Sequence, residues 1–341
     1  MSDSQQAPAT RPYIGGQAVI EGVMMRSPRC LTVAVRRKNN EIVVREQPWK
    51  PMVPPALLKV PFVRGALVLF ESMQNGYAAL QFSASQYEQD LPEDERSSEA
   101  EGSGGAASRL GMVISIGLLV ALPKLLAWGA GHLVGPGLSI ADPRFHLLAG
   151  FFKFSIVVGM MLLMRMNSEM YRVFQYHGAE HKAIAVHEAG LPLSVESSRR
   201  FTTRHARCGT TFLMVVVLVS VAVFALVLPL LLPNSSGILT ILASIAISIP
   251  LMFPIAGVAY ELQRLGARFA DNPIAQIFLA PGFLVQRITT AEPTDDQVEI
   301  ALVALRQALT NEASAPALSP VTEPSVRTFP SFAAFATEQG L

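Results

Sequence analysis

The residues best suited to chemistry lie between two apolar segments of the chain. His177 and His181 are four positions apart in His177-Gly-Ala-Glu-His181, so a helix places both imidazoles one turn apart on one face. This spacing lets two histidines reach one metal ion. The string also matches the inverted zinc-peptidase pattern H-x-x-E-H, in which the glutamate is the general base and not a ligand. We therefore expect a divalent metal site with Glu180 as its catalytic residue.

Further residues decide how such a site is completed. At 100° per residue, Glu188 falls within about 20° of the face that carries the two histidines, whereas His187 points away from it. His205 and Cys208 are three positions apart and can share one ion, and a thiolate with an imidazole favours zinc. The expected metal ligands are His177, His181, His205, Cys208 and Glu188.

The same residues are compatible with two alternatives to a catalytic metal site. A polar helix at a membrane surface, with histidines and glutamates bonded to neighbours or lipid headgroups, is the main alternative to metal binding. If a metal does bind, three ligands and a water favour a hydrolase, whereas four ligands favour a non-catalytic scaffold held together by the ion. Ion transport is disfavoured, because Lys124 is the one charged residue that we expect in the middle of a span.

Two more segments hold residues that could line a site. Gly15-Gly-Gln-Ala-Val-Ile-Glu-Gly-Val-Met-Met-Arg26 contains Glu21 and Arg26, although a glycine turn feeding a strand accounts for it more simply. Glu261 and Arg264 share one helical face at the end of the last apolar segment. For that pair, helix stabilisation and a role in the site are equally compatible with the spacing.

The composition indicates a membrane protein. Of 341 residues, 50% are hydrophobic and only 16% are charged, whereas soluble proteins carry about 25% charged residues. Four apolar runs, at 111–134, 145–166, 212–232 and 238–258, are long enough to cross a hydrocarbon core of about 30 Å. The predicted fold class is therefore mainly α, a polytopic helical membrane protein with four spans. A net charge of +1 argues against nucleic acid as a partner, and two cysteines exclude a disulfide framework.

Loop charge predicts the orientation in the membrane. The loop between the second and third runs is rich in basic residues. In the loop between the first and second runs, Arg144 is the only basic residue. Since basic loops stay in the cytoplasm, we expect this loop and both termini to be cytoplasmic. Lys124 lies near the centre of the first run, where insertion costs about 2.5–3.5 kcal/mol, so either it faces protein or water or this helix lies shallow.

The remaining segments have their own patterns. β-Branched and polar residues alternate on both sides of Asn39-Asn40, which predicts a β-hairpin. A helical apolar pattern from residue 56 is interrupted by Lys59, Arg64 and Glu71, which favours an interfacial or bundle-packed amphipathic helix over a span. An acidic, Gly/Ser-rich stretch is typical of a flexible linker. Past residue 294, a threonine cap and an acidic first turn predict a soluble amphipathic helix.

These patterns divide the chain into seven expected parts. They are a disordered N-terminus (1–12), a small cytoplasmic β element (13–55), an amphipathic interfacial helix (56–87), an acidic flexible linker (88–109), a four-span domain with a cytoplasmic His/Glu/Cys loop (110–260, loop 167–211), a cytoplasmic helical region (261–311) and a disordered tail (312–341).

Several motifs together resemble one protein family. They are Gly15–Arg26, Tyr176-His-Gly-Ala-Glu-His-Lys182, Arg207-Cys-Gly-Thr210, Pro281-Gly-Phe-Leu-Val-Gln286 and Thr289-Thr-Ala-Glu-Pro293. In this order they are similar to the YqhQ-like family, bacterial membrane proteins of unknown function that are labelled predicted metal-dependent enzymes. The resemblance implies a multi-pass protein of the bacterial cytoplasmic membrane, with the lipid bilayer as its surroundings. Protein partners are not indicated, and both a monomer and a homo-oligomer remain open.

Overall fold

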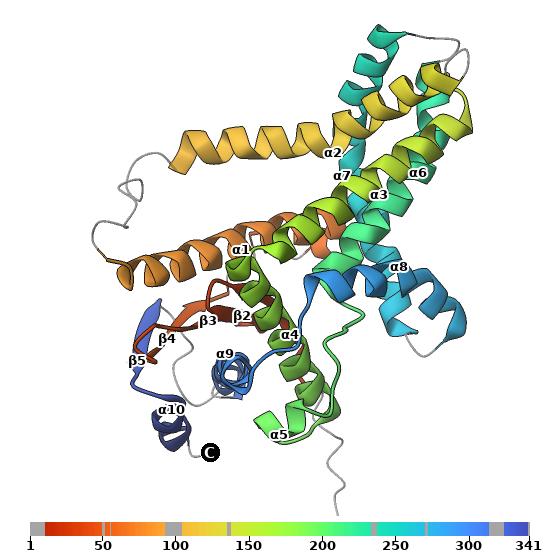
Figure 1. The fold of residues 1–341 in the computed structure, drawn as a ribbon. Coiled ribbons are helices and arrows are strands. Elements are labelled where there is room, and N and C mark those ends of the chain that lie inside the picture. Colours follow the sequence, from red (N-terminus) through yellow and green to blue (C-terminus); the bar gives the residue numbers. More distant parts are fainter. Residues whose placement is uncertain are drawn as a thin grey trace, which may run out of the picture.

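The structure is a computed structural model that describes residues 11–49, 52–54, 56–92, 104–134, 138–232, 237–269, 272–313 and 324–339. A bundle of long helices adjoins a part built on a five-stranded sheet (Figure 1). Residues 1–10 of the predicted disordered N-terminus and residues 93–103 of the predicted linker lie outside the described ranges. Within that linker, the described residues 104–109 are helical.

Long apolar helices make up the bundle. In the described ranges, three helices are long and apolar enough to cross a membrane: α3 (Pro143–Met166), α6 (Gly209–Leu231) and α7 (Ile238–Arg268). They coincide with the second, third and fourth predicted spans. The first predicted span lies in α2 (Gly104–Val134), whose apolar stretch is shorter. The structure therefore shows three candidate spans where the sequence predicts four.

Two lysines lie inside the bundle. Lys124 of α2 is buried, and its ammonium donates to the Ser248 hydroxyl at 2.5 Å and to the Ser244 carbonyl at 2.9 Å, both on α7. It thus faces protein, which is one of the expected arrangements. Lys153 of α3 donates to Ser220 of α6 at 3.0 Å. The expectation that Lys124 is the one charged residue in the middle of a span is therefore wrong, because Lys153 also lies inside an apolar run.

The sheet is antiparallel throughout and contains the predicted hairpin. Its order is β1 (Gly15–Val19), β2 (Gly22–Arg26), β3 (Cys30–Arg36), β4 (Ile42–Pro48) and β5 (Ser325–Phe329). Strands β3 and β4 pair around the Asn39-Asn40 turn, where Asn40 has a φ of 68°. The glycine-rich segment near the N-terminus is itself a hairpin, with Glu21 in the turn at a φ of 49°.

The two faces of the sheet bury different side chains. Val23, Ala34 and Val44 point to one face and pack in the same core as α4 (Ser168–Ala189) and α9 (Asp295–Ala313). Val33 and Val35 point to the other face, where α1 (Val63–Gln89) contributes Ala79 and Phe82. This alternation follows from the two-residue period of a strand. The sheet therefore lies between α1 and the α4–α9 layer (Figure 1).

The prediction of a disordered tail is wrong for residues 324–339. Strand β5 pairs with β4, and the following helix α10 (Phe332–Glu338) buries Phe335 against Phe329, with ring centroids 5.2 Å apart. Arg327 pairs with Glu46 of β4 at 3.3 Å. The proline- and alanine-rich composition concealed this short strand and helix, which gain their stability from the existing sheet edge.

The helix α4 connects the bundle to the sheet. It starts one residue after α3, where Asn167 caps its first turn by accepting from the Glu169 and Met170 backbone amides. It ends at Gly190, which is left-handed with a φ of 69°. The short helix η1 (Leu57–Lys59) precedes α1, and both begin within the segment that was predicted to be amphipathic. The remaining elements are α5 (Val195–Ser198) and α8 (Pro273–Thr289).

Candidate metal centre

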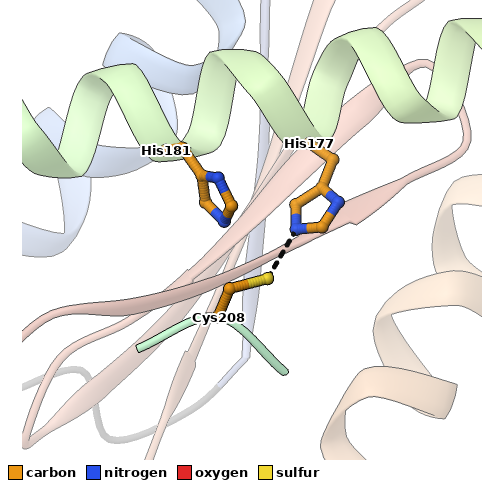
Figure 2. A group of neighbouring side chains, drawn as sticks. All are labelled: His177, His181 and Cys208. Atoms are coloured by element: carbon orange, nitrogen blue, oxygen red, sulfur yellow. Dashed lines mark hydrogen bonds between the residues drawn. The ribbon is translucent and has the colours of Figure 1, made fainter. Parts of the chain in front are cut away.

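Three of the predicted ligands meet at one point. His177 and His181 lie one turn apart on α4, and Cys208 is the N-cap residue of α6 (Figure 2). One ligand atom from each residue lies within 4.8 Å of the other two. The His177 Nε2 and Cys208 Sγ atoms are 3.2 Å apart. The group can hold a metal ion, because the two imidazoles and a thiolate are ligands that zinc accepts.

Backbone carbonyls orient both imidazoles. The Nδ1 atom of His177 lies 2.8 Å from the Thr289 carbonyl oxygen, and that of His181 lies 2.5 Å from the Thr203 carbonyl oxygen. Since a carbonyl oxygen only accepts, each Nδ1 donates, and Nε2 is directed towards the group. Histidines that bind metals make this type of hydrogen bond with their other ring nitrogen.

The electrostatics of the group favour a thiolate. Burial by itself raises the pKa of Cys208, but the charge of His177 and hydrogen bonds from both histidines outweigh it and hold the pKa well below its ordinary value. Burial lowers the pKa of His177, whereas the Cys208 charge and hydrogen bond and the Glu180 charge raise it to about 9. A divalent cation can replace the imidazolium proton as the partner of the thiolate.

Glu180 lies beside the group and is buried. Its Oε2 atom is 3.7 Å from His181 Nε2 and 3.9 Å from His177 Nε2. Strand β1 closes over it: a Cβ atom on Gly16 would lie 2.6 Å from Glu180 Cγ. Glycine at this position therefore lets the sheet approach the carboxylate.

A cavity of about 100 Å³ adjoins the group. Its lining includes the three candidate ligands, Glu180, and the side chains of Tyr13 and Arg207. The Arg207 guanidinium lies 4.7 Å from the centre of the Tyr13 ring. The cavity has room for water and a small polar group next to Glu180.

The other two predicted ligands lie outside the three-residue group. His205 also lines the cavity, and its ring centre is 5.6 Å from that of His181. Its Nε2 atom bonds to Glu188 at 3.3 Å, and Glu188 also pairs with Arg207. His187, which was expected to point away, bonds to the Pro12 carbonyl oxygen at 3.2 Å.

The remaining candidates make contacts between elements. Glu21 accepts two hydrogen bonds from Arg172 at 2.5 Å each, which joins the β1–β2 turn to α4. Arg26 lies 3.6 Å from the centre of the Trp49 ring. Glu261 pairs with Arg64 of α1 at 2.5 Å, and Arg264 is one turn further along α7. In the described ranges, none of these four lines the cavity next to Glu180.

Two buried glutamines hold the loop before Cys208, and sequence reasoning missed them. Gln286 of α8 donates to the His205 carbonyl at 2.8 Å and accepts from the His205 amide at 2.9 Å. Gln263 of α7 donates to the Cys208 carbonyl at 3.0 Å. An amide side chain within an otherwise apolar helix was the available signal. The acceptor carbonyls of Thr203 and Thr289 have no such signal, because any residue carries one.

Comparisons with known proteins agree on one family. A family model described as "Protein of unknown function (DUF1385)" matches residues 60–311. The "Uncharacterized protein YqhQ" of Bacillus subtilis (strain 168) is 32% identical over 310 residues, which cover 89% of this chain and 94% of that protein. No solved structure matches the chain. The matched region contains all three residues of the metal-binding group.

Proposed function

The chain belongs to the DUF1385 family of proteins of unknown function and is YqhQ-like, and from this premise we propose that it is a metal-dependent hydrolase of the bacterial cytoplasmic membrane. Its metal ligands are His177, His181 and Cys208, and its general base is Glu180. Zinc is the metal that two imidazoles and one thiolate favour. The catalytic centre faces the cytoplasm, where thiols stay reduced.

One observation carries this proposal. Both imidazoles direct Nε2 towards the Cys208 sulfur while Nδ1 is held by a carbonyl, and a buried carboxylate lies beside them. Three protein ligands with a fourth position for water are typical of catalytic zinc sites, whereas structural sites have four. The adjoining cavity supports an open fourth position.

The chain's own residues have distinct tasks in this chemistry. A bound divalent cation supplies Lewis acidity and activates water near neutral pH. Glu180 accepts a proton from a water molecule in the cavity, since its carboxylate lies beside both Nε2 atoms. Gly16 keeps Glu180 in this position. Arg207 also lines the cavity, with its charge paired to Glu188.

A non-catalytic scaffold is the second candidate. His205 lines the same cavity and lies close to His181, so a rotation of its ring supplies a fourth ligand. A closed four-ligand site would then join α4 to the start of α6 without catalysis.

A paired measurement on Glu180→Gln separates the two candidates. This change keeps the size of the side chain and removes the base. If the protein is a hydrolase, the purified variant retains its metal, measured by elemental analysis. The same variant fails to restore the wild-type phenotype to a strain from which the gene is deleted. Glu196→Gln is the matched control and leaves both readouts unchanged, because Glu196 is exposed on α5 and does not line the cavity. Full restoration by metal-replete Glu180→Gln contradicts the hydrolase, and loss of metal in that variant contradicts its role as a base.

A further inference from the structure

A larger hollow lies between α8 and the loop that leads to Cys208. Its volume is about 570 Å³, and its polar lining consists of Thr202, Arg204, Gln276 and Arg287. The side chains of Phe283 and Leu284 are among its apolar lining. In the described part of the chain, no carboxylate lines this hollow.

The two arginines of the hollow carry positive charge that no described carboxylate neutralises. Arg204 and Arg287 are exposed, and neither side chain has an ion pair or hydrogen bond with any residue that the structure describes. By contrast, Arg64, Arg172 and Arg207 are all paired with glutamates. Two free guanidiniums around one hollow match the geometry and charge of a phosphate group.

Helix α8 lies across the ends of the membrane helices. Its Gln286 bonds to Thr211 in the first turn of α6 at 2.7 Å. Arg165, in the last turn of α3, donates to the carbonyls of Ile288 and Thr290 at 2.6 and 3.1 Å. Figure 1 shows α8 at the end of the bundle that adjoins α4. If α3 and α6 cross the membrane, α8 lies at its surface.

One face of α8 is apolar and unpartnered. Ile274, Ile277 and Leu284 are 77%, 75% and 56% exposed, and their spacing of three and seven residues places them on the same helical face. Arg287 follows one turn later on that face. An exposed apolar face with arginine at its edge is typical of a helix that lies in the membrane interface.

We propose that this hollow binds the phosphate headgroup of an anionic phospholipid. Arg204 and Arg287 contact the phosphate, Thr202 and Gln276 offer hydrogen bonds to the headgroup, and an acyl chain lies along Leu284 and the exposed face of α8. The lipid, rather than a free phosphate ion, is the occupant because the charged hollow and the exposed apolar face are continuous on one helix. This site does not depend on the proposed metal centre.

Native mass spectrometry of the full-length protein in a neutral detergent tests the lipid site. The probes are phosphatidylglycerol, phosphatidylcholine with the same acyl chains, and inorganic phosphate. We expect phosphatidylglycerol to bind and the other two to bind weakly. Arg204→Gln and Arg287→Gln should each weaken phosphatidylglycerol binding about fivefold, the equivalent of ~1 kcal/mol for one basic residue at an anionic surface.

Arg200→Gln is the matched control. Arg200 is an exposed arginine four positions before Arg204, and it does not line the hollow. Unchanged affinity in this variant supports a specific site, whereas an equal loss contradicts one. Equal binding of phosphatidylcholine overturns the role of the arginines, and binding of inorganic phosphate as tight as that of the lipid overturns the role of α8.

Discussion

The two histidines of the metal-binding group owe their orientation to carbonyl groups from distant parts of the chain. The loop after α5 supplies the Thr203 carbonyl, and the last residue of α8 supplies the Thr289 carbonyl. Each hydrogen bond fixes the ring before any ion binds. The fold therefore contributes to the orientation of both imidazoles.

Removal of one ligand should empty the site. We expect His177→Ala, His181→Ala and Cys208→Ala each to lower bound metal at least about tenfold after dialysis against a weak chelator, measured by elemental analysis. His187→Ala is the control, because the His187 imidazole bonds to the Pro12 carbonyl oxygen and to no residue of the metal-binding group. If His205→Ala alone empties the site, the ligand set differs from the one proposed.

Gly16 offers a test that leaves every ligand in place. In Gly16→Ala the new methyl group meets the Glu180 side chain at 2.6 Å, so Glu180 must move. We expect a loss of about 1–3 kcal/mol in stability, the usual cost of overpacking, and failure to restore the deletion phenotype with metal retained. Gly15→Ala has nothing within 4 Å of its added atom and should behave as wild type. Equal behaviour of the two variants in thermal unfolding and rescue would contradict this arrangement.

The sequence predicted all three residues of the metal-binding group, together with His205 and Glu188, which lie outside it. Helical spacing was sufficient for His177 and His181, because both lie on one regular element. Cys208 was predicted from its residue type, and it joins the group because the loop before it folds back onto α8 through Gln286. The same loop directs His205 towards Glu188. Glu188 was predicted as a ligand from helical spacing along α4 alone. That argument could not take account of Arg207, whose charge holds Glu188 away from the group.

At the scale of elements, α4 has two roles. One face carries the histidines, and other residues pack into the core that α4 shares with the sheet and α9. Glu21, in the β1–β2 turn, reinforces this contact through Arg172. The rigid sheet thus supports the helix that carries the histidines. A free interfacial helix would not have this support.

Another contact between elements predicts a dependence of stability on pH. Burial raises the pKa of Asp90, but hydrogen bonds from the Arg37 side chain and the Lys38 amide outweigh it, so the net pKa is lowered. The contact between the end of α1 and the β3–β4 hairpin therefore stabilises the fold above the unfolded pKa of about 3.9 and is lost as the pH falls through the folded pKa.

Asp90→Asn tests this contact. We expect about 0.5–1 kcal/mol less stability at pH 7, typical of an exposed or half-buried pair, and a smaller decrease in stability between pH 5 and pH 3 than in wild type. Denaturant unfolding of the full chain in detergent measures both. Asp296→Asn is the control, because Asp296 is exposed and its carboxylate has no ion pair in the described ranges. An identical pH profile for wild type and Asp90→Asn would contradict the prediction.

Regular elements with strong periodicity were predictable, and elements that depend on distant partners were not. The β3–β4 hairpin and the long apolar helices followed from local pattern. Strand β5 did not, because its partner β4 is more than 270 residues away in sequence. The first predicted span contained Pro123 and Lys124, and within the described part of α2 the apolar stretch is Gly117–Leu133. Figure 1 shows that α2 also changes direction along its length, as a proline within a helix favours.

At the scale of the whole molecule, the sheet, α1, α4 and α9 lie at one end of the helical bundle (Figure 1). The candidate metal centre lies where this part meets the start of α6. The arrangement agrees with the proposal that both termini and the loop at 167–211 share one compartment.

Cysteine labelling tests that orientation. With a membrane-impermeant maleimide, Ala141→Cys should react in intact cells, because the loop between α2 and α3 is proposed to be external. Glu196→Cys and Glu338→Cys should react only after permeabilisation; both glutamates are more than half exposed. The native Cys30 and Cys208 are buried and give a low background. Labelling of Glu196→Cys in intact cells would reverse the orientation and contradict a cytoplasmic metal centre.

The sheet order has a consequence for how the protein is made. Strand β4 ends at Pro48, but its outer neighbour β5 starts at Ser325. At about 5–20 residues per second, a ribosome needs roughly 15–55 s to synthesise the chain between them. For that time the nascent sheet keeps an unpaired edge, and its apolar face lacks α9, while the helices of the bundle enter the membrane. An unpaired edge invites aggregation, so this edge of the sheet is protected only after β5 has been synthesised.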